Sequence, residues 1–252
     1  MSHRDHGSPV LSILLAVAVI AVAVLFPILT TPRSPSRIDA CLWNEKGIGL
    51  ALVQYAQDND GQLPDGTQGE GEGWGGQVFP YIKDARTYRC YEDETAGAAS
   101  SPVVSYGYNA NAARQPLLGK YASPAHTVLV FEVAHDTADV ALPDEGASQG
   151  AVSFSAAGDG TDGTLRSGRG GERYATGLLG GRTPAEFTDF DEPRHGGGAN
   201  YLLADGHVRW LQPQDVSGGT DAARPRDPQM GATRGTAAGT GNGAYKATFS
   251  WK

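Results

Sequence analysis

The stretch ANYLLADGHVRWL, residues 199–211, decides the fold because it predicts a β-hairpin. Runs of strand-forming residues flank Asp205 and Gly206, and Asp-Gly is a preferred pair for a two-residue type I′ turn, in which both residues have positive φ. Alternation places Tyr201 and Leu203 on one face of the first strand and Leu202 on the other. The hairpin therefore has an apolar side on which a helix can pack.

His195 precedes this hairpin and is followed by three glycines. At about 3.3 Å per residue, the first strand separates His195 from Asp205 by roughly 15 Å or more. A catalytic His–Asp pair needs hydrogen-bond contact of about 2.6–3.2 Å. We therefore predict no catalysis here: Asp205 and Gly206 form the turn, and the His195 ring contacts the glycine-rich backbone or a neighbouring loop. A hydrolase that uses His195 and Asp205 is the least favoured hypothesis.

The pattern of residues 38–61 predicts a helix. Asp39 can cap its start, and Gly61 stands just after its end. Apolar residues at helical spacing form one face: Leu42, Ile48, Leu52 and Tyr55. Gly47 and Gly49 each cost about 1 kcal/mol relative to alanine in a helix. The helix therefore depends on packing, and its glycines allow close approach to a flat partner such as a sheet.

Residues 10–30 form an apolar run without any charge. At about 1.5 Å per residue, such a run spans a hydrocarbon core of about 30 Å, which predicts one transmembrane helix. A buried helix of a soluble domain and a cleaved signal peptide are the alternatives. Retention is favoured because the A-x-A patterns lie inside the run and not beyond it. Residues 1–9 are then a cytoplasmic stub and residues 31–38 a linker.

Cys41 and Cys90 are the two cysteines of the chain. An even pair in a glycine-rich domain fits an oxidising compartment, so we predict a Cys41–Cys90 disulfide, with two unpaired buried thiols as the alternative. Such a bridge contributes a few kcal/mol in the chain-entropy model. It would place the domain outside the cytoplasm.

The composition bounds the remaining possibilities. A chain of 252 residues with 40% hydrophobic content holds one sizeable domain plus appendages, and 35 glycines and 15 prolines indicate many loops. A net charge of -8 argues against a nucleic-acid binder. Two cysteines leave little material for a structural zinc site, and neither CxxC nor HExxH occurs. No metal or cofactor is expected, apart from the calcium alternative that follows.

Acidic residues in two turn-rich loops are weak candidates for calcium ligands: Asp58, Asp60, Asp159 and Asp162. The loop that contains Asp60 does not have the spacing of an EF-hand. Turn-rich loops also contain the same residue types without any ion. We therefore favour solvated acidic loops, and a calcium- or glycan-binding envelope module remains the alternative function.

Two further groups contain residue types that carry chemistry. His126, Glu132 and His135 flank one predicted strand, where His126 and Glu132 share a face and His135 faces the other way, so incidental surface placement is favoured over a metal site. Ser153 and Ser155 lie near acidic residues but outside any G-x-S-x-G elbow, so no nucleophile is predicted.

Beyond the hairpin and the helix, the chain alternates between strands and loops. Residues 103–110 and 127–134 predict strands, because they are rich in β-branched and aromatic residues. Residues 136–193 form a Gly-, Ser- and Asp-rich excursion, for which we expect surface loops with one or two short strands. Residues 212–252 predict a low-complexity tail with a terminal strand at its end.

A resemblance to a known family connects these elements. His195, nine residues, and then Asp205-Gly206 match the motif of the pilin-like proteins with a prepilin-type processing-associated H-x9-DG domain, which are abundant in planctomycetes. CLWNEKGIGLALVQYAQDNDGQLP is similar to the helix of that family, and YRCYEDE, SYGYNA and SPAHTVLVFE resemble its following segments in the same order. The resemblance extends from about residue 8 to 211.

The resemblance implies a pilin-like α+β fold, in which a long N-terminal helix, embedded in the membrane in its first half, packs on an antiparallel sheet in residues 39–211. It also implies a non-catalytic, single-pass pseudopilin-like component of a type II secretion, type IV pilus-like or envelope assembly. Its partners would be membrane lipid, copies of itself or pseudopilus components. Its place would be the bacterial inner membrane, with the C-terminal domain on the periplasmic side.

The N-terminus departs from the family pattern. A prepilin signal has glycine followed by Phe-Thr-Leu-x-Glu, whereas Gly7 is followed here by Ser8, and Ser12 stands where glutamate is expected. Pro9 also lies just beyond the cleavage point. We therefore expect an unprocessed, membrane-anchored relative that is not cleaved after Gly7.

Overall fold

The structure is a computed structural model, and it describes residues 13–19, 37–66, 73–98, 102–143, 145, 154–158, 160, 173–174, 194–217 and 245–251. The chain divides into two compact units, Met1–Ser36 and Arg37–Lys252. In the first unit, residues 13–19 are helical and their side chains are exposed, while the rest of the predicted span 10–30 lies outside the described residues. Among the described residues, no helix has both the length and the apolar character that crossing a membrane requires.

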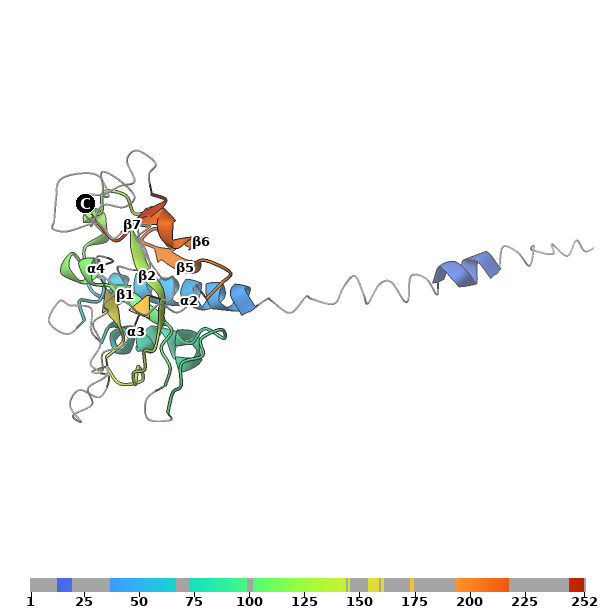
Figure 1. The fold of residues 1–252 in the computed structure, drawn as a ribbon, viewed down its shortest axis with the longest axis horizontal. Helices are drawn as coiled ribbons and strands as arrows, with labels where there is room; N and C mark the ends of the chain where they lie inside the picture. The colour runs from blue at the N-terminus through green and yellow to red at the C-terminus, as the bar shows by residue number, and fades with distance from the viewer. Residues whose placement is uncertain are drawn as a thin grey trace, which may run out of the picture. The chain divides into compact units, whose positions relative to one another are not determined.

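The second unit contains the labelled helices and strands of Figure 1. Its helices are α2 (Arg37–Asp58), α3 (Trp74–Ile82), η1 (Ala85–Tyr88), α4 (Ala110–Arg114), η2 (Leu118–Lys120) and η6 (Pro213–Asp215). Its strands are β1 (Tyr106–Asn109), β2 (Val128–Ala134), β3 (Ala157–Gly158), β4 (Arg173–Tyr174), β5 (Ala199–Leu203), β6 (Val208–Leu211), β7 (Val216–Ser217) and β8 (Ala247–Thr248). Helices and sheet occur together, which confirms the α+β class.

The main sheet has the strand order β3-β1-β2-β5-β6, and β4 pairs with β2. The neighbours from β1 to β6 are antiparallel, whereas β3 runs parallel to β1. The prediction of an entirely antiparallel sheet is therefore wrong at this edge. The reason is that β3 follows a long connection, and a crossover of a dozen or more residues can bring a strand back in parallel.

The hairpin predicted at residues 199–211 is present, with Asn200 opposite Trp210. Its turn differs from the predicted type I′ turn, because Leu203 and His207 close a three-residue loop through a hydrogen bond from the amide of Leu203 to the carbonyl of His207 (2.8 Å). Gly206 has φ +87°, and Asp205 is not among the residues with positive φ. This is the pattern of a type I turn followed by a left-handed glycine, which leaves Asp205 in ordinary backbone.

Helix α2 packs on the sheet through a face of small and apolar residues. Its buried face contains Cys41, Glu45, Ile48, Ala51, Leu52 and Ala56. Leu42 and Tyr55, which we predicted on this face, are only partly buried. A Cβ on Gly49 would lie 2.8 Å from Cδ1 of Leu202 in β5, so a glycine is needed where the helix approaches the sheet. The expected close approach is confirmed at Gly49.

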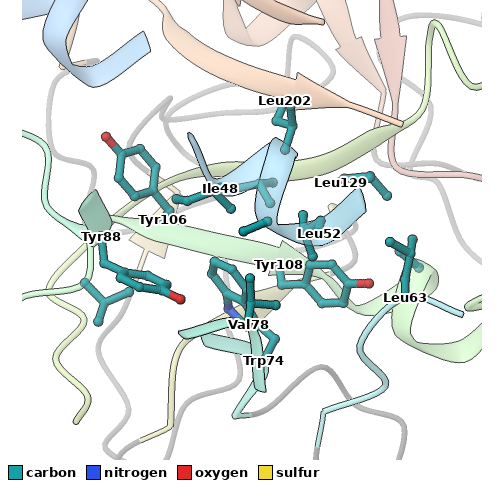
Figure 2. Close-up of a cluster of buried hydrophobic side chains, with 14 of the residues drawn as sticks. Ile48, Leu52, Leu63, Trp74, Val78, Tyr88, Tyr106, Tyr108, Leu129 and Leu202 are labelled. Carbon is teal, nitrogen blue, oxygen red and sulfur yellow. The ribbon is translucent and has the colours of Figure 1, made fainter. Parts of the chain in front are cut away.

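The sheet is covered on both faces. Ile48 and Leu52 of α2 lie among Tyr106, Tyr108 and Leu202 on one face, as Figure 2 shows. The opposite face holds a second core, which includes Phe131, Tyr201, Leu203, Val216 and Phe249. The rings of Phe131 and Phe249 lie 5.1 Å apart, so the described end of the segment 212–252 packs on the sheet. A strand, β8, is present there and pairs with β7.

Helix α3 begins at Trp74 and contains two glycines in its first turn. Its first amides are satisfied from elsewhere in the chain: the amide of Gly76 donates to Glu145 (2.8 Å) and that of Gly75 to Ser155 (3.0 Å). The hydroxyl of Ser155 also donates to Glu145 (2.7 Å). Tertiary contacts therefore stabilise a helix that its two glycines and Pro80 disfavour.

Candidate functional site

The candidate site is a buried cluster around His195. Its Nδ1 lies 2.7 Å from Oε2 of Glu92, and its Nε2 lies 2.8 Å from Oε1 of Glu132. The side chains of His195 and Glu132 are both fully buried. Since each ring nitrogen faces a carboxylate, the geometry favours the imidazolium, which donates a hydrogen bond from both nitrogens.

Three segments bring these groups together. Glu132 projects from β2 toward the face of the sheet that carries Val130, because side chains alternate along a strand. Glu92 follows Cys90, whose disulfide with Cys41 ties this segment to the first turns of α2. The Sγ of Cys90 lies 3.6 Å from Nε2 of His195. The disulfide is thus part of the His195 environment, and its prediction is confirmed.

The three glycines after His195 allow its side chain to enter the core. Gly196 and Gly197 have φ of +65° and +99°, a backbone conformation that glycine adopts easily. A Cβ on Gly198 would lie 2.6 Å from the carbonyl oxygen of Leu211. The indole of Trp210 donates to the carbonyl of His195 (3.0 Å), which fixes the backbone next to the ring.

Arg194 adds a second cation beside His195. Its guanidinium forms a buried ion pair with Asp93 (3.2 Å) and donates to the carbonyl of Val133 (2.6 Å). Asp93 also accepts from the hydroxyl of Ser105 (2.6 Å). Consecutive residues of the chain, Arg194 and His195, therefore pair with consecutive acidic residues, Asp93 and Glu92.

The charges in this cluster shift the pKa values of two groups. Burial opposes protonation of His195, but the hydrogen bonds and charges of Glu132 and Glu92 outweigh it, so the pKa of His195 lies above its ordinary value. Burial, and next the charge of Glu132, raise the pKa of Glu45 well above its ordinary value, while Arg194 lowers it. Glu45 is fully buried, and neither of its carboxyl oxygens has a hydrogen-bond partner within the described part of the chain.

Asp205 and Gly206 lie at the turn of the hairpin. Asp205 accepts from the amide of His207 (3.0 Å), and its Oδ2 lies 2.9 Å from Nδ1 of the His207 ring. The side chain of His207 is 78% exposed. The hydrogen bonds of Asp205 thus belong to the turn, whereas those of His195 belong to the core.

Of the weak calcium candidates, the structure describes Asp58 and Asp60. Asp58 accepts from the hydroxyl of Tyr81 (3.1 Å), and Asp60 has φ +53° just after α2. Asp159 and Asp162 lie outside the described residues.

The other candidates from the sequence that the structure describes have different surroundings. The ring of His126 contacts the hydroxyl of Ser123 (2.7 Å), and His135 is exposed. Ser155 serves the start of α3, and Ser153 lies outside the described residues. Incidental surface placement is wrong for Glu132, which is buried.

Sequence reasoning predicted that the His195 ring contacts the glycine-rich backbone or a neighbouring loop, and Glu92 lies in such a loop. It did not identify Glu92 or Glu132 as the partners of His195, and it missed Glu45. Two signals could have found some of these groups. Glu45 lies four residues after Cys41, on the same helix face. Glu132 lies inside the continuous apolar run of residues 128–134, which is typical of a strand that is buried on both faces. Glu92 lies in a turn two residues after Cys90, where no helical or strand periodicity indicates its position. The Cys41–Cys90 disulfide holds this segment near α2.

Comparison of the chain with protein-family models, curated proteins and solved structures finds no match.

Proposed function

We propose that this chain is a non-catalytic, single-pass membrane-anchored protein of the pilin-like H-x9-DG type, and that it acts as a structural component of a secretion, pilus-like or envelope assembly. Residues 10–30 would anchor it in the bacterial inner membrane, and the unit Arg37–Lys252 would lie on the periplasmic side. The observation that carries this proposal is the closed state of the His195 cluster. In this cluster the His195 side chain is fully buried, and both of its ring nitrogens contact carboxylates.

Burial supports the absence of catalysis. A general base must reach the proton that it abstracts, at about 2.6–3.2 Å or through one water. Both ring nitrogens of His195 are already engaged by Glu92 and Glu132. We expect the cluster to hold three segments together: β2, the segment after Cys90 and the start of β5.

The outer face of α2 supports an assembly role. It presents exposed apolar side chains at helical spacing, among which Trp43 is 62% exposed and Leu50 67%. Lys46 lies over the Trp43 ring at 4.6 Å, between these two residues on the helix. A pseudopilin-like component would cover such a face with lipid or with neighbouring subunits.

The topology is tested with the full chain expressed in a bacterium. We expect it to resist extraction from membranes at alkaline pH, and we expect protease added to spheroplasts to digest the unit after residue 37. A chain with V19R and V22R should lose membrane retention, because each central charge costs about 2.5–3.5 kcal/mol of insertion. The matched control carries V19L and V22L. A wild-type domain that stays protected inside spheroplasts would overturn the proposal.

The processing state is tested by the mass of the mature N-terminus. Retention of Met1 or Ser2 supports an uncleaved anchor. A chain that begins at Ser8 would show prepilin-type cleavage after Gly7, and a start beyond residue 20 would show removal of a signal peptide.

A further inference from the structure

Four buried side chains around the disulfide have the donor types of a metal site. One ligand atom each from Cys41, Cys90, Glu132 and His195 lies within 4.8 Å of the others, and all four residues are buried. Two thiolates, an imidazole and a carboxylate are ligands that Zn²⁺ accepts in tetrahedral sites. The two sulfurs are bonded to each other in this structure, so the donor set becomes complete only when the disulfide is reduced.

The ligand histidine has the outer partner that zinc sites use. A metal-bound histidine almost always donates its second ring nitrogen to a carboxylate or carbonyl, which fixes the direction of the first. Nε2 of His195 faces Glu132 and Cys90, while Nδ1 is held by Glu92 at 2.7 Å. The second carboxyl oxygen of Glu132, Oε2, accepts a hydrogen bond from the backbone amide of Asn200 (3.3 Å). Both ligands that are not sulfur are thus already oriented.

The spacing of the cluster suits a zinc ion. Cys90 Sγ and His195 Nε2 are 3.6 Å apart, close to the separation of two ligands around tetrahedral Zn²⁺ with bonds of about 2.0–2.3 Å. The two sulfurs must move apart to about 3.7 Å. Their Cα atoms are 5.0 Å apart, so rotation of the two side chains can supply this change.

The unpartnered acid at the edge of the cluster is an independent observation. Glu45 lies one helical turn after Cys41, is fully buried, and has no hydrogen-bond partner at either oxygen within the described residues. Buried carboxyl groups are normally paired or bound to a metal. Glu45 thus adds a buried carboxyl group, without a hydrogen-bond partner among the described residues, one helical turn from the Cys41 ligand.

We propose that reduction of the Cys41–Cys90 disulfide converts this cluster into a closed zinc site, held by Cys41, Cys90, Glu132 and His195. A dithiol reductant supplies two electrons and two protons: the S–S bond breaks, two thiols form, and the reductant becomes a cyclic disulfide. Zn²⁺ then displaces the two thiol protons and the proton on Nε2 of His195. The metal does not change its oxidation state. The same four side chains therefore close the domain covalently when oxidised and through the ion when reduced.

The test uses the full chain in detergent, reduced with dithiothreitol under argon until both thiols titrate, and then desalted. Co²⁺ is added as a spectroscopic probe, followed by Zn²⁺. We expect about one metal per chain, thiolate-to-cobalt charge-transfer bands, the d–d bands of tetrahedral cobalt, and loss of these bands when Zn²⁺ displaces Co²⁺. The oxidised protein should give none of them. A reduced wild-type protein that binds no metal, or binds it without charge-transfer bands, would overturn the proposal.

Paired variants locate the site. E132Q removes a ligand and should weaken Co²⁺ binding by more than tenfold, and E92Q removes the outer partner of His195 and should weaken it by about 10–100-fold. E94Q is the matched control, because Glu94 is exposed and close to Glu92 in the chain. Near-ultraviolet circular dichroism of the tryptophans reports whether each variant is folded. Equal affinities for folded E92Q, E132Q and E94Q would place the metal elsewhere and contradict the assignment.

Discussion

The two ends of the H-x9-DG interval lie in opposite environments. At one end, the His195 ring is buried between two glutamates, next to a disulfide. At the other end, Asp205 contacts His207, whose side chain is 78% exposed. Strand β5 thus connects the buried His195 to the turn at Asp205 on the surface. The nine residues between His195 and Asp205 include all of β5.

The difference between the two ends is also energetic. Removing one partner of a buried ion pair leaves a charge without compensation, whereas exposed pairs contribute about 0–1 kcal/mol. We therefore expect the His195 end to dominate the stability of the domain.

Replacing His195 by alanine should lower the free energy of unfolding by about 3–5 kcal/mol, because Glu92 and Glu132 lose their shared cation in the core. The measurement is urea denaturation, followed by tryptophan fluorescence. His207→Ala is the matched control at the other end, and it should change stability by no more than about 0.5 kcal/mol. Equal losses for the two histidines would refute the contrast.

Replacing both Cys41 and Cys90 by serine should cost about 2–4 kcal/mol, because the bridge constrains the unfolded chain between residues 49 positions apart. The same urea titration measures this loss. In the NMR spectrum of the folded state, we expect the amide resonances near His195 to shift. Those of the Asp205 turn should stay unchanged. A double variant as stable as the wild type would show that the disulfide does not support the cluster.

The sequence predicts much of the scaffold for identifiable reasons. Alternation in residues 199–211 predicts the hairpin, and helical spacing predicts α2. Gly47 and Gly49 predict a close approach to a flat partner, which the structure shows for Gly49 at Leu202. Local periodicity suffices for these elements, because one face of each is buried. The Cys41–Cys90 pairing follows from the even count of cysteines.

The remaining features depend on contacts between distant segments. Helix α3 starts where Glu145 and Ser155 accept hydrogen bonds from its first amides. The sequence of residues 74–82 does not predict these contacts. His195 and Glu132 are 63 residues apart in the chain and meet only when β2 and β5 pair. The membrane span predicted at residues 10–30 stays a prediction.

Replacing Gly206 by alanine tests the turn end alone, at a cost of about 1–2 kcal/mol, because the residue has φ +87°. A Cβ there would meet nothing within 4 Å, so the cost comes from backbone conformation and not from a clash. Gly206→Asn should cost less, since asparagine tolerates the left-handed region better. If alanine were neutral, the proposed turn geometry would be wrong.

The pH dependence should be the smallest effect. The folded state raises the pKa of His195, so its contribution is fully present below the ordinary pKa of about 6.5 and is lost as pH rises through the folded value. The raised pKa of Glu45 acts in the same direction. We expect the free energy of unfolding to fall above about pH 6.5.

The control for this prediction is a pair of histidine variants. H195Q should flatten the fall in the free energy of unfolding, and H207Q should leave it unchanged. A wild-type protein that becomes more stable as the pH rises through this range would contradict the assigned sign.

The most direct test of the central claim is a pair of double-mutant cycles on the free energy of unfolding, one combining H195Q with E132Q and the other combining H195Q with D205N. The account predicts a coupling of about 1–3 kcal/mol for His195 with Glu132, because the two side chains are in contact. It predicts a coupling within about 0.5 kcal/mol of zero for His195 with Asp205. A strong coupling between His195 and Asp205, with none between His195 and Glu132, would contradict it.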